Sequence, residues 1–317
     1  MSTGPLTLRE ILGLSPWRTR LAEAALAIRG DAYTPPSRTG LSSLKILRPS
    51  LALALWRDQR PFGRSVPIYN LFNRTPTPIA DGWSLEKTQV RDFRGGTLTY
   101  NSHNATDFAT PPGTVVVAAA PGRVALIKSE YNRGGLKVLL DHGDGLMTAS
   151  VHLARALVNV GDVVARGQPI ALSGASGLNF PAALFCDPPH LHFGTWLDGE
   201  PVDPYAVLGE ASLWRGGAPT PHRGGPDVTL PPSEFDAAAV DATIAGCVDP
   251  AMATELRGHA ELASRAAHTI FAANYYPTRF PARPNPYGQT HPRTPRLDLP
   301  FAADDYDDAT FALEPRA

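Results

Sequence analysis

Pro189-His190-Leu191-His192-Phe193 is the stretch from which the fold and the chemistry of this chain are best inferred. Two histidines separated by one residue, within an apolar run, point to the same face of a β-strand because strand side chains alternate with a period of two. At a rise of about 3.3 Å per residue, their Cα atoms would lie about 6.6 Å apart. One imidazole could then bind a metal while its neighbour reaches a water or a substrate.

Short runs with β-strand composition surround this stretch. They are rich in Val, Leu, Ile and Thr, are separated by glycine turns, and cover residues 114–118, 122–128, 136–141, 146–151, 170–173 and 191–197. Many short strands at this spacing favour an antiparallel sandwich or barrel over a parallel α/β sheet. The sequence therefore predicts a mainly β fold, an antiparallel β-sandwich or hybrid barrel.

Helical and proline-rich segments flank the predicted β region. Helices are predicted from composition over residues 7–13, 18–29, 233–245 and 252–273. Gly30 is a natural stop for the second of them. Proline-rich stretches at 218–232 and 275–300 favour extended connectors or arms along the surface.

We therefore predict three parts in the chain. Residues 1–84 form an N-terminal helical and irregular segment, residues 85–209 form the β core, and residues 210–317 form a C-terminal helical region with a Pro-rich tail. A chain of 317 residues is long enough for one large domain or two modest ones, each with a proper core.

Charge and apolar content narrow the classes of partner. With 29 basic and 30 acidic side chains the net charge is -1, so nucleic acid is not expected as the main partner. The apolar stretch 46–56 is interrupted by Arg48 and Pro49 and is far shorter than the ~20 residues of a membrane span.

The amino terminus has no signal-peptide pattern, so a cytoplasmic location is expected from sequence alone. Cys186 and Cys247 are expected to be free thiols.

A second group of metal-binding side chains precedes the His-Leu-His pair. His103-Asn104-Ala105-Thr106-Asp107 supplies a histidine and a carboxylate four residues apart. Zinc binds imidazole nitrogen and carboxylate oxygen, and a catalytic zinc site keeps three protein ligands and an open position. His103, Asp107 and His192 would make such a set.

A third piece is Ser150-Val151-His152-Leu153, at the end of a predicted strand. A histidine at this place can stand beside the first histidine of the His-Leu-His pair without binding metal. There it would donate a hydrogen bond to an oxyanion or act as a proton shuttle. Three separate pieces of sequence thus point to one site.

Together these pieces resemble the lysostaphin-type (LytM-like) zinc metalloendopeptidases, which cut cell-wall peptides. The resemblance covers roughly residues 95–208, about a third of the chain, in the order of the family's motifs. The matching residues are His103-x-x-x-Asp107-Phe108-Ala109, Pro112-Gly113-Thr114, Ala119-x-x-Gly122-x-Val124, His142-Gly143-Asp144-Gly145-Leu146, His152-Leu153, Val160-Gly161-Asp162-Val163-Val164-x-x-Gly167-Gln168-x-Ile170, Gly174-x-x-Gly177, His190-Leu191-His192-Phe193 and Asp198-Gly199-x-Pro201-Val202-Asp203-Pro204.

The resemblance implies a compact antiparallel fold with a narrow groove. His103, Asp107 and His192 would hold Zn²⁺, and the family's two catalytic histidines fall on His152 and His190. The implied substrate is a peptide, as in peptidoglycan cross-links or stem peptides, and the implied location is the cell envelope or the exterior. Zinc supplies hydroxide at neutral pH by lowering the pKa of bound water from about 15.7 to about 7.

The loop over residues 178–189 is longer than is usual in this family. It is expected to bring Phe180, Phe185, Cys186 and Asp187 near the mouth of the groove. Cys186 would be an inhibitory or additional zinc ligand, or a loop thiol that merely packs, and the packed thiol is the preferred interpretation.

Two other classes of protein stay open at this point. The hairpin pattern over residues 160–170 also occurs in phosphocarriers and in biotinyl or lipoyl carriers. A biotinyl or lipoyl carrier presents a lysine in the hairpin, whereas Lys128 and Lys137 lie in predicted strands, and a phosphocarrier uses paired histidines but does not require the His103/Asp107 pair. The other alternative is a catalytically silent scaffold that binds peptidoglycan or activates another hydrolase. An active hydrolase is preferred because all five site residues are present. The oligomeric state stays open.

Overall fold

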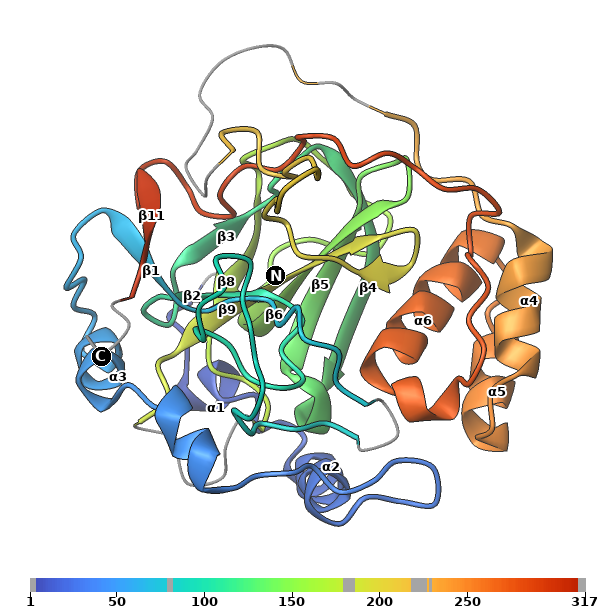
Figure 1. Ribbon diagram of the computed structural model, residues 1–317, viewed down its shortest axis with the longest axis horizontal. Helices are drawn as coiled ribbons and strands as arrows, with labels where there is room; N and C mark the ends of the chain where they lie inside the picture. The colour runs from blue at the N-terminus through green and yellow to red at the C-terminus, as the bar shows by residue number, and fades with distance from the viewer. Residues whose placement is uncertain (1–3, 79–81, 179–185, 218–226, 228–229, 313–317) are drawn as a thin grey trace.

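A computed structural model describes residues 4–78, 82–178, 186–217, 227 and 230–312 of the chain. Within these residues eleven strands form one sheet, whose main path runs β11-β1-β2-β9-β6-β5-β4-β7 (Figure 1). The strands are β1 (Ser65–Asn70), β2 (Thr106–Ala109), β3 (Val115–Val117), β4 (Gly122–Glu130), β5 (Gly135–Asp141), β6 (Leu146–Ala156), β7 (Val163–Val164), β8 (Pro169–Ser173), β9 (His190–Leu197), β10 (Glu200–Pro201) and β11 (Asp308–Phe311).

The strand pairing confirms the predicted fold class. All pairs are antiparallel except β1 with β11, which is parallel. The predicted strands correspond to β3, β4, β5, β6, β8 and β9. The sheet is mixed only at the edge where the chain returns to β1 after a long excursion, because a parallel partner needs a crossover rather than a tight turn.

Two apolar clusters lie on opposite sides of the central strands. One contains Phe193 of β9 and Leu153 of β6, together with side chains from the segment that follows the helices. The other contains Trp196 of β9 and Met147 of β6, which pack against α6. Neighbouring residues of one strand enter different clusters because their side chains alternate between the faces of the sheet.

Three helices lie on the side of the second cluster: α4 (Ala237–Ala245), α5 (Pro250–Arg257) and α6 (Leu262–Tyr275). Of these, α6 packs on the sheet, and α4 and α5 pack on α6. In Figure 1 they lie beside β4, with α6 nearest to the strands. The prediction of one helix over 252–273 is wrong, because α5 ends at Arg257, with Gly258 as its C-cap, and α6 begins only at Leu262. Glycine weakens a helix, and the chain turns there so that α6 can pack on the sheet.

The N-terminal helices are α1 (Leu8–Ile11) and α2 (Trp17–Arg29), in agreement with the sequence, followed by the 3-10 helix η1 (Leu41–Ile46) and by α3 (Pro49–Trp56). Gly30 ends α2 with a φ of 69°, a conformation that glycine adopts without strain. Helix α2 packs on the short 3-10 helix η3 (Tyr131–Arg133) between β4 and β5.

The Pro-rich segment after α6 follows the body of the molecule, as Figure 1 shows in orange and red. It buries Leu297, Leu299, Phe301 and Tyr306 in the first apolar cluster and then forms β11. The described residues of this segment therefore pack on the domain, in line with the predicted arm along the surface. The division at residues 84 and 209 stays a prediction, but the sheet takes strands from all three parts.

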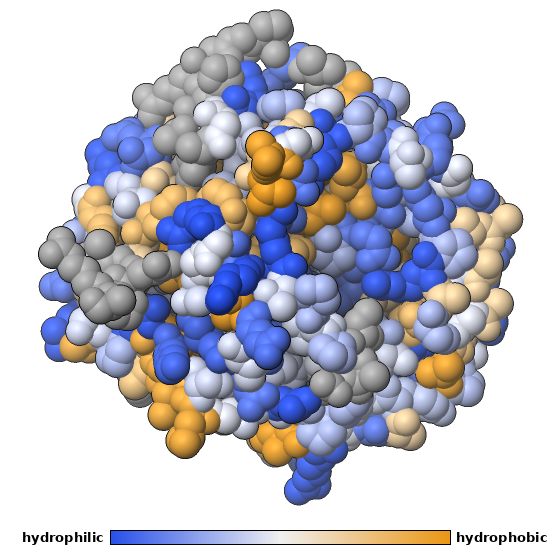
Figure 2. All heavy atoms as spheres, in the orientation of Figure 1, coloured by the Kyte–Doolittle hydropathy of each residue, from blue (hydrophilic) through white to orange (hydrophobic). Residues whose placement is uncertain are grey.

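The described helices fall short of the combined length and hydropathy of a membrane span. No described helix is both long and apolar enough to cross a bilayer. On the face in Figure 2, exposed apolar side chains form small separate groups among hydrophilic ones. Cys186 and Cys247 are both free thiols, as the sequence predicts.

Candidate metal centre

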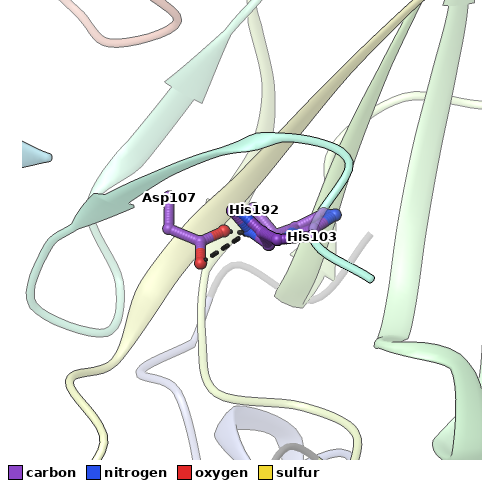
Figure 3. A group of neighbouring side chains, drawn as sticks. All are labelled: His103, Asp107 and His192. Carbon is purple, nitrogen blue, oxygen red and sulfur yellow. Dashed lines mark hydrogen bonds and ion pairs between the residues drawn. The ribbon is translucent and has the colours of Figure 1, made fainter. Parts of the chain in front are cut away.

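The register of β2 and β9 brings the first two candidate ligands together. Asp107 of β2 lies directly opposite His192 of β9, so their side chains share a face of the sheet. His103 lies in the turn just before β2 and folds back toward the same point (Figure 3). His103 and Asp107, four residues apart, thus meet the distant His192 where two neighbouring strands pair.

The distances suit a metal ion. Among the described residues, His103, Asp107 and His192 form a buried group whose ligand atoms all lie within 4.8 Å of one another. His192 Nδ1 lies 2.9 Å from Asp107 Oδ1, and His103 Nε2 lies 2.9 Å from Asp107 Oδ2. A carboxylate flanked by two imidazoles is a ligand set that zinc accepts.

His103 provides a direct test of whether these residues fit a metal. Its Nδ1 lies 2.7 Å from the carbonyl oxygen of Leu71, so Nδ1 carries the proton and donates it to that oxygen. Nε2 is then a bare lone pair; it is buried and makes no hydrogen bond, although the Asp107 carboxylate is close. Two electron-pair donors that face each other in a buried site are explained by a cation between them.

The protonation states agree with this arrangement. Burial alone would raise the pKa of Asp107, but the nearby His103 and His190 imidazoles and the hydrogen bond from His192 bring it well below its usual value. Burial lowers the pKa of His192, against the opposing effect of Asp107. An ionised carboxylate and a neutral imidazole are the forms that bind a metal.

Strand β1 supplies a further contact to Asp107, although the sequence gives no sign that β1 belongs to the site. Asn70 Nδ2 donates a hydrogen bond to Asp107 Oδ2 over 3.0 Å. The apolar run 66–72 was visible in the sequence, but nothing in it indicated that this strand would lie beside β2. Outer contacts of this kind fix the direction of a ligand.

His152 reaches the site through a backbone irregularity. Val151 lies opposite His192 and shares its face, so regular alternation would turn His152 to the other side. Instead His152 has a φ of 61°, and the β5–β6 register shifts at this point. The bulge places its ring 4.6 Å from that of His190. A positive φ is uncommon for a residue with a side chain and is a strain typical of functional sites.

His152 and His190 are each held by one ring nitrogen. His152 Nδ1 lies 2.8 Å from the carbonyl oxygen of Ser176, and burial, together with the neighbouring histidines, puts the pKa of His152 well below its usual value. His190 Nδ1 lies 2.8 Å from both the Pro188 carbonyl oxygen and the Tyr69 hydroxyl. Each imidazole therefore keeps Nε2 for the cavity side.

A cavity of about 420 Å³ lies over this group. Asp107, His192, His190 and His152 line its floor. Its walls come from α2, η1, η3 and α6 and from the segment around Trp83. Asp187 lines it too and accepts a hydrogen bond from Tyr69, whereas the predicted Phe180 and Phe185 lie outside the described residues. The space is large enough for a few residues of a peptide.

Other candidate residues are placed away from this chemistry. Lys137 is fully buried and Lys128 pairs with Glu130 and Glu255, so neither is presented at a hairpin tip as a carrier lysine would be. Within the described chain, Cys186 does not belong to the metal-binding group. His142 is hydrogen-bonded to the Pro121 carbonyl oxygen and to the Thr148 hydroxyl.

Comparisons with known proteins support the resemblance seen in the sequence. Residues 101–204 match the family model of peptidase family M23, the lysostaphin-type family. The chain is 30% identical over 175 residues to peptidoglycan DD-endopeptidase ShyB of Vibrio cholerae, covering 55% of this chain and 39% of that protein. It is 41% identical over 98 residues to murein hydrolase activator EnvC of Escherichia coli, covering 31% of this chain and 21% of that protein.

A solved structure is also similar, with 30% sequence identity. It is a zinc-containing peptidase from Vibrio cholerae, and the match covers 45% of this chain and 39% of that chain with a TM-score of 0.33. This chain spans less than half the length of the curated relatives named above. The match to the family model concerns residues 101–204, which carry the site.

Proposed function

We propose that the β region is a zinc-dependent endopeptidase that hydrolyses a peptide bond in peptidoglycan, and that it works in the cell envelope. The observation that carries the proposal is the His103 Nε2 lone pair aimed at the ionised Asp107 carboxylate, with His192 on the other oxygen. His103, Asp107 and His192 are the proposed metal ligands. The names of the relatives, an endopeptidase of peptidoglycan among them, supply the substrate class.

His152 and His190 are the proposed catalytic residues. Because Ser176 holds Nδ1 of His152, its Nε2 is the atom that can exchange a proton with, or donate a hydrogen bond to, a substrate in the cavity. His190 lies edge-on to His152 and is held by Pro188 and Tyr69, so the pair is fixed before a substrate arrives. Bound zinc would supply a Lewis acid and would lower the pKa of water to about 7.

The test is digestion of purified peptidoglycan by the zinc-loaded chain, with released fragments identified by mass spectrometry. Cleavage of a peptide bond that a chelator abolishes and zinc restores is the expected result. Zinc bound in one equivalent without any cleavage would contradict catalysis and favour a binding or activating scaffold, in line with the activator among the relatives.

The division of roles has its own test. His152→Ala is expected to keep zinc, because His152 is outside the group of ligands, and to lose activity by about 10²- to 10⁴-fold, the usual contribution of one acid–base residue. Zinc content by atomic absorption and cleavage rate are measured on the same preparation. Loss of zinc in His152→Ala would show that this residue is a ligand.

A further inference from the structure

The part of the cavity that η3 lines, called here its η3 end, contains a buried arginine that the proposed chemistry does not use. Ala27 and Ile28 of α2, Tyr275 of α6 and Asn132 and Arg133 of η3 line this end. Arg133 is 8% exposed. It lies in the same continuous space as Asp107, His192, His190 and His152.

Within the part of the chain that the structure describes, Arg133 forms no ion pair. Its Nε donates to the Tyr275 carbonyl oxygen over 2.8 Å, and Nη1 donates to the Asn132 carbonyl oxygen over 3.1 Å. Among the described residues no carboxylate lies within ion-pair distance of it, and Nη2 has no hydrogen-bond acceptor. Burial lowers the pKa of Arg133, but a guanidinium stays protonated in proteins.

Arg279 shows what a fully matched arginine looks like in the same neighbourhood. Both guanidinium groups lie over the ring of Tyr276, at 5.0 Å for Arg133 and 4.7 Å for Arg279. Arg279, which is 6% exposed, forms ion pairs with Asp31 and Asp249. A buried charge normally has such a partner because leaving water is costly. Arg133 faces the cavity where Arg279 has its carboxylate partners.

The location of Arg133 relates it directly to the proposed catalytic residues. The backbone N–H of His152 donates to the carbonyl oxygen of Gly134, the next residue after Arg133, over 3.1 Å. Helix α2 fixes η3 from the other side, because Arg20 donates to Ser129 and the N–H of Tyr131 donates to Glu23. Arg133 is therefore held rigidly beside His152.

We propose that Arg133 is a specificity residue that binds a free carboxylate of the substrate near the bond to be cleaved. The inference rests on the proposed function and deepens it, since it selects peptides with an unamidated α- or side-chain carboxylate on the side of the bond that enters this end of the cavity. A guanidinium with an open N–H recognises a carboxylate by a charge-assisted hydrogen bond.

The test compares one substrate in two forms. Cross-linked muropeptides are released from peptidoglycan by a muramidase, and half of the sample is converted to carboxamides with a carbodiimide and ammonium chloride. The zinc-loaded full chain is expected to cleave the free acid with a kcat/KM about tenfold or more above that of the amide, mainly through KM, the size expected for one hydrogen bond to a charged group. This comparison needs no variant.

Variants assign the preference to Arg133. Arg133→Gln is expected to lose the preference while cleaving the amide within about twofold of the natural chain, and Arg133→Lys, which keeps a charge, should recover part of it. Arg123→Gln is the matched control, because it removes one positive charge on β4 where the side chain bonds Gly161 instead of lining the cavity. It should leave the preference intact.

Two results would overturn the inference: equal cleavage of acid and amide by the natural chain, or a preference that survives in a folded Arg133→Gln. If the zinc-loaded chain cleaves neither form, binding of both to that same protein is measured by calorimetry. Tighter binding of the acid that depends on Arg133 would then support the inference while the proposed function fails. Equal binding of the two forms would reject the inference as well.

Discussion

One face of strand β9 contains two regions that differ completely in character. At one end, His190 and His192 lie at the floor of the cavity; at the other end, on the same face, Trp196 packs with Ile270 and Phe271 under α6. On the neighbouring strand β6, Val151 and Met147 both belong to the cluster beneath the helix, and Val151 also lines the cavity.

The difference between the two regions lies in what covers them. The strand period is the same throughout, and both halves are buried from bulk water. Over one half α6 fills the space with side chains. Over the other half α2, η1 and η3 form walls and leave a cavity of about 420 Å³. The candidate site lies where the covering segments leave a space above the sheet. The polar residues of β9, His190 and His192, line that space.

The largest expected effect is a loss of zinc and activity, and it comes from a substitution in the half of the sheet face that borders the cavity. His192→Ala removes one of the three proposed ligands, and we expect zinc to be lost and peptidoglycan cleavage to fall at least about 10³-fold. The fold should survive, because the side chain faces the cavity. Zinc content, cleavage rate and circular dichroism are measured together. Retained zinc with normal cleavage would remove His192 from the site.

The next largest effect is a loss of stability, and it comes from a substitution in the half of the sheet face that lies under α6, the covered half. Trp196→Ala creates a void under α6, where the indole is 2% exposed and lies 6.2 Å from the Tyr275 ring, and should reduce the free energy of unfolding by about 3–5 kcal/mol. Denaturant titration measures this. At low temperature the folded variant should still bind one zinc. A variant that is stable but loses zinc would show that the two halves are not separable.

The smallest effect concerns Lys137, a buried cation in the covered half. Its Nζ donates to the Gly135 carbonyl oxygen and lies 5.3 Å and 5.2 Å from the Phe271 and Tyr275 ring centroids. Burial lowers the pKa of Lys137 from 10.5 to about 7, with Glu130 opposing the shift. Between these pH values the unfolded chain holds the extra proton, so stability should rise with pH from 7 to 10.5.

Lys137→Met tests whether stability rises with pH because of this lysine. The variant should be more stable at pH 7 by about 1–3 kcal/mol, because no cation has to be desolvated, and the rise between pH 7 and 10.5 should become flatter. Thermal unfolding of both proteins across this range is the measurement. A less stable variant at pH 7 would mean that the two aromatic rings hold the lysine in its charged form.

The strands and their order of appearance were accessible from sequence because period-two patterns and glycine turns are local signals. The approach of Asp107 to His192 follows from a single register, once both are assigned to neighbouring strands. The His-x-x-x-Asp and His-Leu-His patterns therefore predicted which residues meet. Their roles as ligands and catalysts are what the experiments above address.

Features that depend on distant parts of the chain could not be predicted. Regular alternation would turn His152 away from the cavity, and only the bulge with its φ of 61° brings it to His190. Asn70 and Tyr69 come from an apolar run whose partners were unknown. Arg133 is one of many arginines in the sequence; its lack of a carboxylate partner within the described chain is visible only in three dimensions.

The pairing of β1 with β11 has a consequence for the order in which the protein forms. Arg64, just before β1, bonds Asp307, just before β11, and these residues are 243 positions apart. During synthesis, the edge of β1 that pairs with β11 stays unpaired until residues 308–311 have emerged. Closing so long a loop is entropically costly and slow. Because β1 also provides Asn70, the contact to Asp107 should mature late, after the central hairpins have formed.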